Sequence, residues 1–110
     1  MILVTDELLK YVQYSDLQKG LNYDNRKVKY VGMGQDSDEF IYRFIVSSEH
    51  TLRSYIVTIY TDKKHNITDT SCTCPQYITT SSCKHIAASL VKYQGEYFLI
   101  DEDDTIDYYA

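Results

Sequence analysis

All three cysteines of the chain lie between residues 72 and 83, and a histidine follows two residues after the last of them. Cys72 and Cys74 are separated by a single residue. In an extended strand, side chains two apart share a face, so these two thiols can reach the same ion. Pro75 favours an extended conformation at Cys74. This spacing constrains the fold more than any other feature of the sequence.

Cys83 and His85 form the second pair, at the start of an apolar run with helical spacing. Residues two apart do not share a face of a regular helix, so Cys83 is predicted at or before the N-cap. The loop over residues 75–82 would then bring this pair back over the first. Three sulfurs and one imidazole complete a tetrahedral structural zinc site and leave no open position. Thiolates favour zinc over magnesium or calcium, with iron as the commonest wrong metal.

Three other interpretations of these residues are open. The cysteines can be unrelated buried side chains beside a surface histidine. Cys72 and Cys74 can form a disulfide, although so short a loop would be strained. Cys83 and His85 can act as nucleophile and base, but the sequence offers no clear third group to orient the histidine. Zinc accounts for all four residues together.

The rest of the sequence predicts an α+β domain. Residues 5–20 have helical character, with Thr5 as cap and Gly20 as stop, and the helix has a weak point near residues 14–15. Alternating apolar residues predict about four antiparallel strands, and the last helix is expected to run from Cys83 towards Gly95, with Ala88 on its outer face. The zinc site would join the last strand to this helix. The predicted strands fall within residues 21–33, 39–48, 52–61 and 67–74.

Charge separates the chain into two parts. Residues 1–95 hold all 11 basic residues and 10 of the 16 acidic ones, which leaves +1, whereas residues 96–110 are acidic. We therefore expect one domain over residues 1–95, with a finger core over 70–95, and an acidic tail or linker over 96–110. This balance is poor for a free-standing nucleic-acid binder. A basic patch of Lys63, Lys64, Lys84 and Lys92 is the candidate nucleic-acid surface, and plain solvation of these lysines is its alternative.

The sequence also bears on location and activity. The N-terminus lacks the basic region of a signal peptide, and no apolar run has the length of a membrane span. An odd number of cysteines then indicates a reducing, cytoplasmic setting. No phosphate-binding loop of a motor ATPase is present, so the chain itself is not expected to be an enzyme.

The pattern Cys72-x-Cys74, spacer, Cys83-x-His85 resembles the CxC…CxH pattern of the SWIM zinc finger. The stretches "CTCP" and "CKHIAA" also resemble the sequences that usually surround the ligands in that family. The strands before it, including "YRFIV" and "SYIVTIY", resemble the segment that precedes the finger in bacterial Snf-family helicases. The resemblance implies a non-catalytic zinc-binding module for protein interaction or regulation beside a helicase motor in cis. It implies no small-molecule substrate and no membrane, and binding of DNA is its alternative function.

Overall fold

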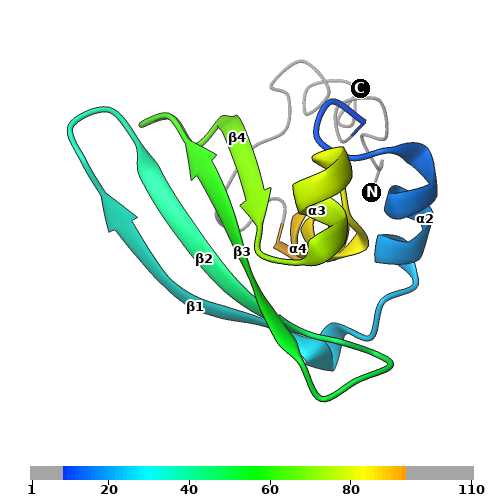
Figure 1. Ribbon diagram of the computed structural model, residues 1–110. Helices are drawn as coiled ribbons and strands as arrows, with labels where there is room; N and C mark the ends of the chain where they lie inside the picture. Colours follow the sequence, from blue (N-terminus) through cyan, green and yellow to red (C-terminus); the bar gives the residue numbers. More distant parts are fainter. Residues whose placement is uncertain (1–8, 94–110) are drawn as a thin grey trace, which may run out of the picture.

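The computed structural model describes residues 9–93 and confirms the α+β class (Figure 1). An N-terminal helix precedes a sheet of four antiparallel strands, and two further helices follow it. The helical elements are α2 (Tyr14–Leu21), the 3-10 turn η1 (Asn25–Lys27), α3 (Pro75–Thr80) and α4 (Lys84–Tyr93). The strands are β1 (Val28–Gln35), β2 (Phe40–Ser47), β3 (Ser54–Thr61) and β4 (Ile67–Cys72).

The strands pair in chain order, β1-β2-β3-β4. Their alternating sequences decide which face each side chain takes, because successive side chains of a strand point to opposite faces. Tyr42, Phe44 and Val46 of β2 are buried, and Val57 and Ile59 of β3 are buried beside them. The register shifts once in β1, between Tyr30 and Gly32, and once between Tyr60 and Thr61 of β3. Because the buried side chains of β2 and β3 all point to the same side, that face of the sheet packs against the core.

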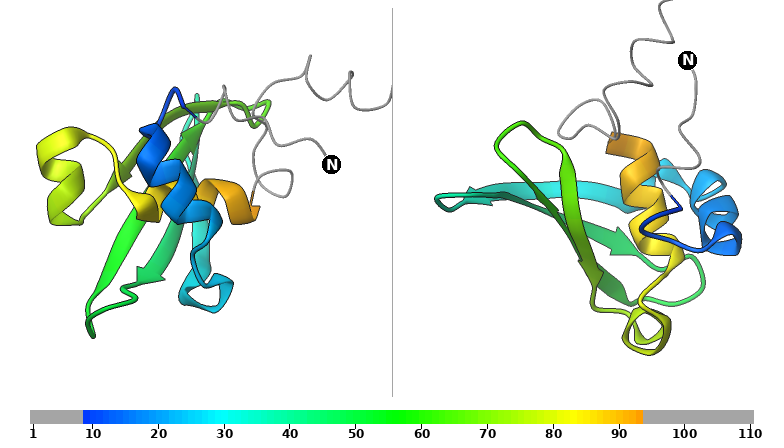
Figure 2. Two further views of the ribbon diagram at one scale, coloured as in Figure 1. Left: turned by 90° about the vertical axis from the view of Figure 1, so that its right-hand side faces the viewer. Right: turned by 90° about the horizontal axis from the view of Figure 1, so that it is seen from above.

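Helices α4 and α2 lie on the same side of the sheet, as Figure 2 shows from above. Helix α4 contributes Ile86 and Leu90, both fully buried, to the core against Phe44 and Ile59. At its end, the Tyr93 hydroxyl accepts a hydrogen bond from the Tyr30 backbone N–H at 3.1 Å. The core thus lies between α4 and the sheet.

Within residues 9–93, no helix is long and apolar enough to cross a bilayer.

The N-terminal helix is shorter than predicted in the described part of the chain. Residues 9–11 form a turn, Val12 is a bend, and α2 begins at Tyr14. The Gln13 backbone N–H donates to the Ser82 hydroxyl at 2.8 Å, so it serves a tertiary contact rather than a longer helix. The predicted cap Thr5 lies outside the described residues, as do the stop at Gly95 and the tail over 96–110.

The segment predicted as a loop over residues 75–82 contains the short helix α3, so that prediction was wrong. Cys74 is its N-cap residue and Pro75 its first residue, a position where the missing proline N–H costs nothing. Ser81 ends the helix in the left-handed conformation, at φ 59° and ψ 21°. Only residues 81–83 then separate α3 from α4.

Helix α4 is buried on both sides, which corrects the prediction that Ala88 faces outward. Ala88 is buried where α2 crosses α4. The crossing is close because Gly20 has no side chain: a Cβ there would lie 2.5 Å from the Ala87 Cβ and 2.7 Å from the Ala88 backbone nitrogen. Helix α4 therefore forms a middle layer between the sheet and α2.

Candidate metal centre

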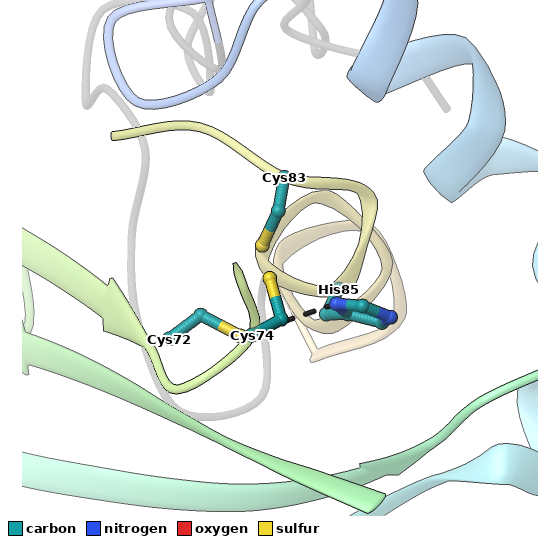
Figure 3. A group of neighbouring side chains, drawn as sticks. All are labelled: Cys72, Cys74, Cys83 and His85. Carbon is teal, nitrogen blue, oxygen red and sulfur yellow. Dashed lines mark hydrogen bonds between the residues drawn. The ribbon is translucent and has the colours of Figure 1, made fainter. Parts of the chain in front are cut away.

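The structure brings Cys72, Cys74, Cys83 and His85 together (Figure 3). One sulfur or ring nitrogen from each residue lies within 4.8 Å of the other three. All four residues are buried, with at most 6% of their surface exposed. They come from the end of β4, the residue before α3, and the beginning of α4. The cluster thus sits where the sheet passes into the last two helices.

The first pair keeps strand geometry beyond the end of β4. The Thr73 backbone N–H donates to the Ile56 carbonyl at 3.1 Å, and the Ile56 N–H donates to the Thr73 hydroxyl at 3.0 Å. Cys74 is extended, at φ −74° and ψ 155°. Thr73 is exposed while both cysteines are buried, so the two thiols share one side, as the spacing predicts.

The second pair stands at the entrance of α4. The helix begins at Lys84, and the Ala87 N–H donates to the Cys83 carbonyl at 3.4 Å, which makes Cys83 the N-cap residue, as predicted. The Nδ1 atom of His85 lies 4.0 Å from the Cys72 sulfur. The rings of Tyr23 and Tyr55 pack on the imidazole, with centroids at 5.9 and 4.9 Å. The imidazole therefore packs against two aromatic rings, with Nδ1 on the side of the Cys72 sulfur.

Burial and crowding raise the pKa values of two of the thiols. The pKa of Cys83 lies well above its ordinary value, because its thiol hydrogen-bonds to Cys72 and because it is buried. Burial likewise raises the pKa of Cys74. Packing three thiolates together is unfavourable without a cation, and a bound divalent ion reverses this preference.

The donor set fits one structural zinc ion. Three soft sulfurs and one imidazole are the donors that zinc favours, and together they fill a tetrahedral shell. The cysteines are not joined by a disulfide in the described part of the chain. A nucleophilic role for Cys83 also fits poorly, since the side chain is fully buried and its pKa is raised.

Comparison with known proteins supports the same conclusion. Residues 55–94 match the family model of the SWIM zinc finger. This SWIM segment runs from β3 through β4 and α3 to α4, and it contains all four members of the cluster. No curated protein and no solved structure matches the chain. The SWIM zinc finger is a non-catalytic type of module, and α2, β1 and β2 lie outside the matched segment.

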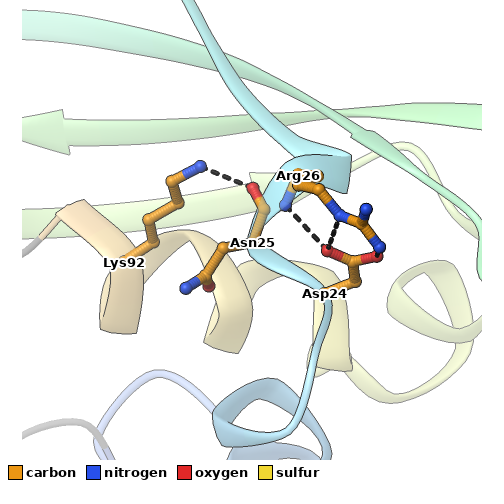
Figure 4. Close-up of polar contacts among 4 residues, drawn as sticks. All are labelled: Asp24, Asn25, Arg26 and Lys92. Atoms are coloured by element: carbon orange, nitrogen blue, oxygen red, sulfur yellow. Dashed lines mark hydrogen bonds and ion pairs between the residues drawn. The ribbon is translucent and has the colours of Figure 1, made fainter.

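The four predicted surface lysines do not gather into one patch. Lys63 donates from Nζ to the Asp36 carbonyl at 2.6 Å, beyond the end of β1. Lys92 donates to the carbonyl of Asn25 in η1 (Figure 4). It also donates to the carbonyl of Val28, the first residue of β1. Strand β1 lies between these contacts, and its seven steps from Val28 to Gln35 span about 23 Å. The other two lysines have different surroundings. The Lys84 ammonium group lies over the Tyr23 ring. Lys64 is exposed.

Three polar residues near the cluster had no signal in the sequence. Asp16 of α2 is buried and accepts hydrogen bonds from Ser82 and Gln76. An acid in the first turn of a helix ordinarily faces solvent, where the helix dipole favours it, so no local pattern predicts that Asp16 is buried. Only the tertiary packing of α2 against the SWIM segment shows its position.

Proposed function

We propose that this chain is a zinc-stabilised protein-interaction module. Cys72, Cys74, Cys83 and His85 would hold one zinc ion, which supplies a structural link between the end of β4 and the beginning of α4. A filled ligand shell leaves no position for a substrate, so the function belongs to the surface that the zinc site holds in place. Residues 1–95 would act as one domain, in a reducing cytoplasm where the thiols remain available to the metal.

Among residues 9–93, the face of the sheet turned away from α2 and α4 carries the proposal. We call Ile41, Ile45, Ile56 and Tyr60 the outer isoleucine face. Ile45 pairs with Ile56 across β2 and β3, and Ile41 pairs with Tyr60. These residues alternate with buried ones, so they lie on the side away from α4, where Ile45 and Ile56 are 39% and 46% exposed. The face thus holds two apolar cross-strand pairs on either side of the Arg43–Thr58 pair. Exposed apolar side chains that lie close together are typical of interaction sites.

Two cationic residues indicate what kind of partner would fit. Arg43 lies between Ile41 and Ile45 along β2, and Lys29 of β1 pairs with Ile45. On the other side of the face, Asp69 pairs with Tyr60. The β1–β2 half of the outer isoleucine face therefore suits a protein surface with aliphatic side chains flanked by carboxylates, because buried apolar area supplies affinity and charge complementarity supplies orientation. The SWIM resemblance suggests a Snf-family helicase motor as this partner.

Site-specific photo-cross-linking tests the proposal. A cross-linking residue at Ile45 should capture one partner protein, whereas the same residue at Ile78 should not, since Ile78 is 77% exposed but lies on α3. The captured protein, once purified, should bind the wild-type chain and lose at least about tenfold in affinity with Ile45→Glu, which removes apolar contact from the face. Ile78→Glu is the matched control and should leave the affinity unchanged.

The nucleic-acid alternative predicts a different result. If the lysines contact phosphates, binding of DNA should weaken steeply as salt rises, because each contact releases counterions. Such binding, lost on Lys64→Ala and Lys84→Ala but unchanged by Ile45→Glu, would replace the protein-interaction proposal. Equal effects of Ile45→Glu and Ile78→Glu on partner binding would also contradict it.

A further inference from the structure

Asp16 is a buried acidic residue that lies outside the SWIM segment yet contacts it. Only 1% of its surface is exposed. Its Oδ2 atom accepts a hydrogen bond from the Ser82 hydroxyl at 2.7 Å. The Gln76 side-chain amide donates to Oδ1 and Oδ2, at 3.0 and 3.1 Å. Both partners are uncharged groups, and both belong to the connection between the two ligand pairs.

The positions of these partners matter for the metal centre. Gln76 lies two residues after Cys74, and Ser82 directly precedes Cys83. One carboxyl group therefore holds both ends of the connection that sets the distance between the ligand pairs. The same connection is fixed from within, because the Thr80 hydroxyl donates to the Ser82 carbonyl at 2.9 Å.

Ser82 is also tied to the chain ahead of α2. Its hydroxyl oxygen accepts from the Gln13 backbone N–H at 2.8 Å while its proton is donated to Asp16. The Ser82 hydroxyl therefore makes two hydrogen bonds to the same element: it accepts from the N-cap residue of α2 and donates to Asp16 within α2. With Gly20 packed against Ala87, α2 fixes both the connection before Cys83 and the helix that carries His85.

Stability of α2 alone does not account for a carboxyl group in this place. Burial of a polar group costs free energy unless its hydrogen bonds are made, and a well-packed apolar residue is often equally stabilising or more so. The carboxyl group instead supplies defined geometry, since its two oxygens hold the donors of Gln76 and Ser82 at fixed positions. Its contribution is to fix the shape of the connection between the two ligand pairs.

We propose that Asp16 is a positioning residue of the zinc site, acting through Ser82 and Gln76, so that α2 completes a metal centre of which the SWIM segment holds only the ligands. Groups that hydrogen-bond directly to metal ligands commonly change metal affinity by about 10–100-fold when they are removed, and Asp16 acts through one further residue, so we expect the lower end of this range. The proposal rests on the zinc site and is independent of any interaction partner.

Zinc affinity and ligand geometry test it in the full chain. Asp16→Ala should lower zinc affinity by about tenfold in competition with a chromogenic chelator. The cobalt-substituted protein should show a weaker, shifted d–d spectrum, and Cys83 should be alkylated before Cys72 and Cys74. Asp16→Asn should restore most of the affinity, because its amide oxygen can accept from Ser82 while the Gln76 amide turns to present its own oxygen.

Two further variants separate positioning from folding stability. Val28→Ala removes apolar volume from a fully buried site at the beginning of β1 and should lower stability. Val28 takes no part in the hydrogen bonds among Asp16, Gln76 and Ser82. It should keep the wild-type cobalt spectrum and Cys83 protection. Gln76→Ala changes an exposed residue, is expected to fold, and should show part of the Asp16→Ala effect. Wild-type zinc affinity and wild-type Cys83 protection in Gln76→Ala, together with no order of labelling among the cysteines of Asp16→Ala, would overturn the proposal. Matching changes in Val28→Ala would overturn it equally.

Discussion

The buried thiols of Cys74 and Cys83 determine how the zinc site responds to pH. Their pKa values are raised, by burial at Cys74 and first by the Cys72 hydrogen bond at Cys83. The metal-free chain therefore keeps these protons at neutral pH, and zinc must displace them. Apparent zinc affinity should rise with pH, with a slope of up to about three protons for three thiols.

Calorimetry in buffers of different ionisation enthalpy measures this proton release. Cys83→Ser should reduce the number of protons released per zinc bound, whereas a substitution at exposed Thr73 should leave that number unchanged. Zinc binding without proton release at pH 7 would contradict the burial of the thiols.

At the same scale, sequence reasoning reached the metal-binding cluster but not its surroundings. Cys72, Cys74, Cys83 and His85 could be grouped because strand and helix-entrance spacings each restrict where a side chain points. Asp16 could not be found, since its role depends on Ser82, 66 positions along the chain. Such a contact leaves no local pattern. The nucleic-acid role of the four lysines stays a prediction.

At the scale of elements, the closest contact is the crossing of α2 and α4. Gly20→Ala would place a Cβ 2.5 Å from that of Ala87, and backbone atoms of α4 prevent an easy adjustment. We expect a loss of about 1–3 kcal/mol in the free energy of unfolding, as for other overpacked sites. Gly32→Ala is the matched control, because a Cβ at Gly32 meets nothing within 4 Å.

Denaturant unfolding of the two variants in parallel checks this difference. Equal stability for both would mean that the two helices can separate without cost. Since β-carbon crowding is the cause, Gly20→Ser should be at least as destabilising as Gly20→Ala.

Strands were the elements that the sequence predicted well. Alternation such as Tyr42, Phe44 and Val46 identifies a strand with one buried face from local residues alone. The helix α3 was missed because six residues are too few for a helical apolar period, and none of them is buried. Pro75 after a capping residue was its available signal. Helix α2 was predicted too long because a tertiary contact takes the N–H of Gln13.

For the whole molecule, zinc should decide whether α4 stays docked. A structural zinc contributes about 10–16 kcal/mol in isolated fingers, comparable to the entire stability of an ordinary domain. Chelation should therefore release at least residues 70–93, while β1, β2 and β3 can persist as a loosened sheet. Hydrogen exchange and thermal melting before and after chelation measure this, and added zinc should restore the melt. An unchanged melt after verified metal removal would exclude a structural role.

The chain-order arrangement of the sheet has a consequence for the speed of folding. Each strand pairs with its neighbour in sequence, so the sheet can assemble through short-range contacts, whereas α2 meets α4 across more than 60 residues of chain. We therefore expect the helices to dock, and zinc to bind, after the rate-limiting barrier of folding has been crossed. Zinc should leave the refolding rate nearly unchanged and slow the unfolding rate by orders of magnitude, a difference that stopped-flow kinetics can resolve. Zinc would then bind in the last step of folding and would have to leave before the chain could unfold.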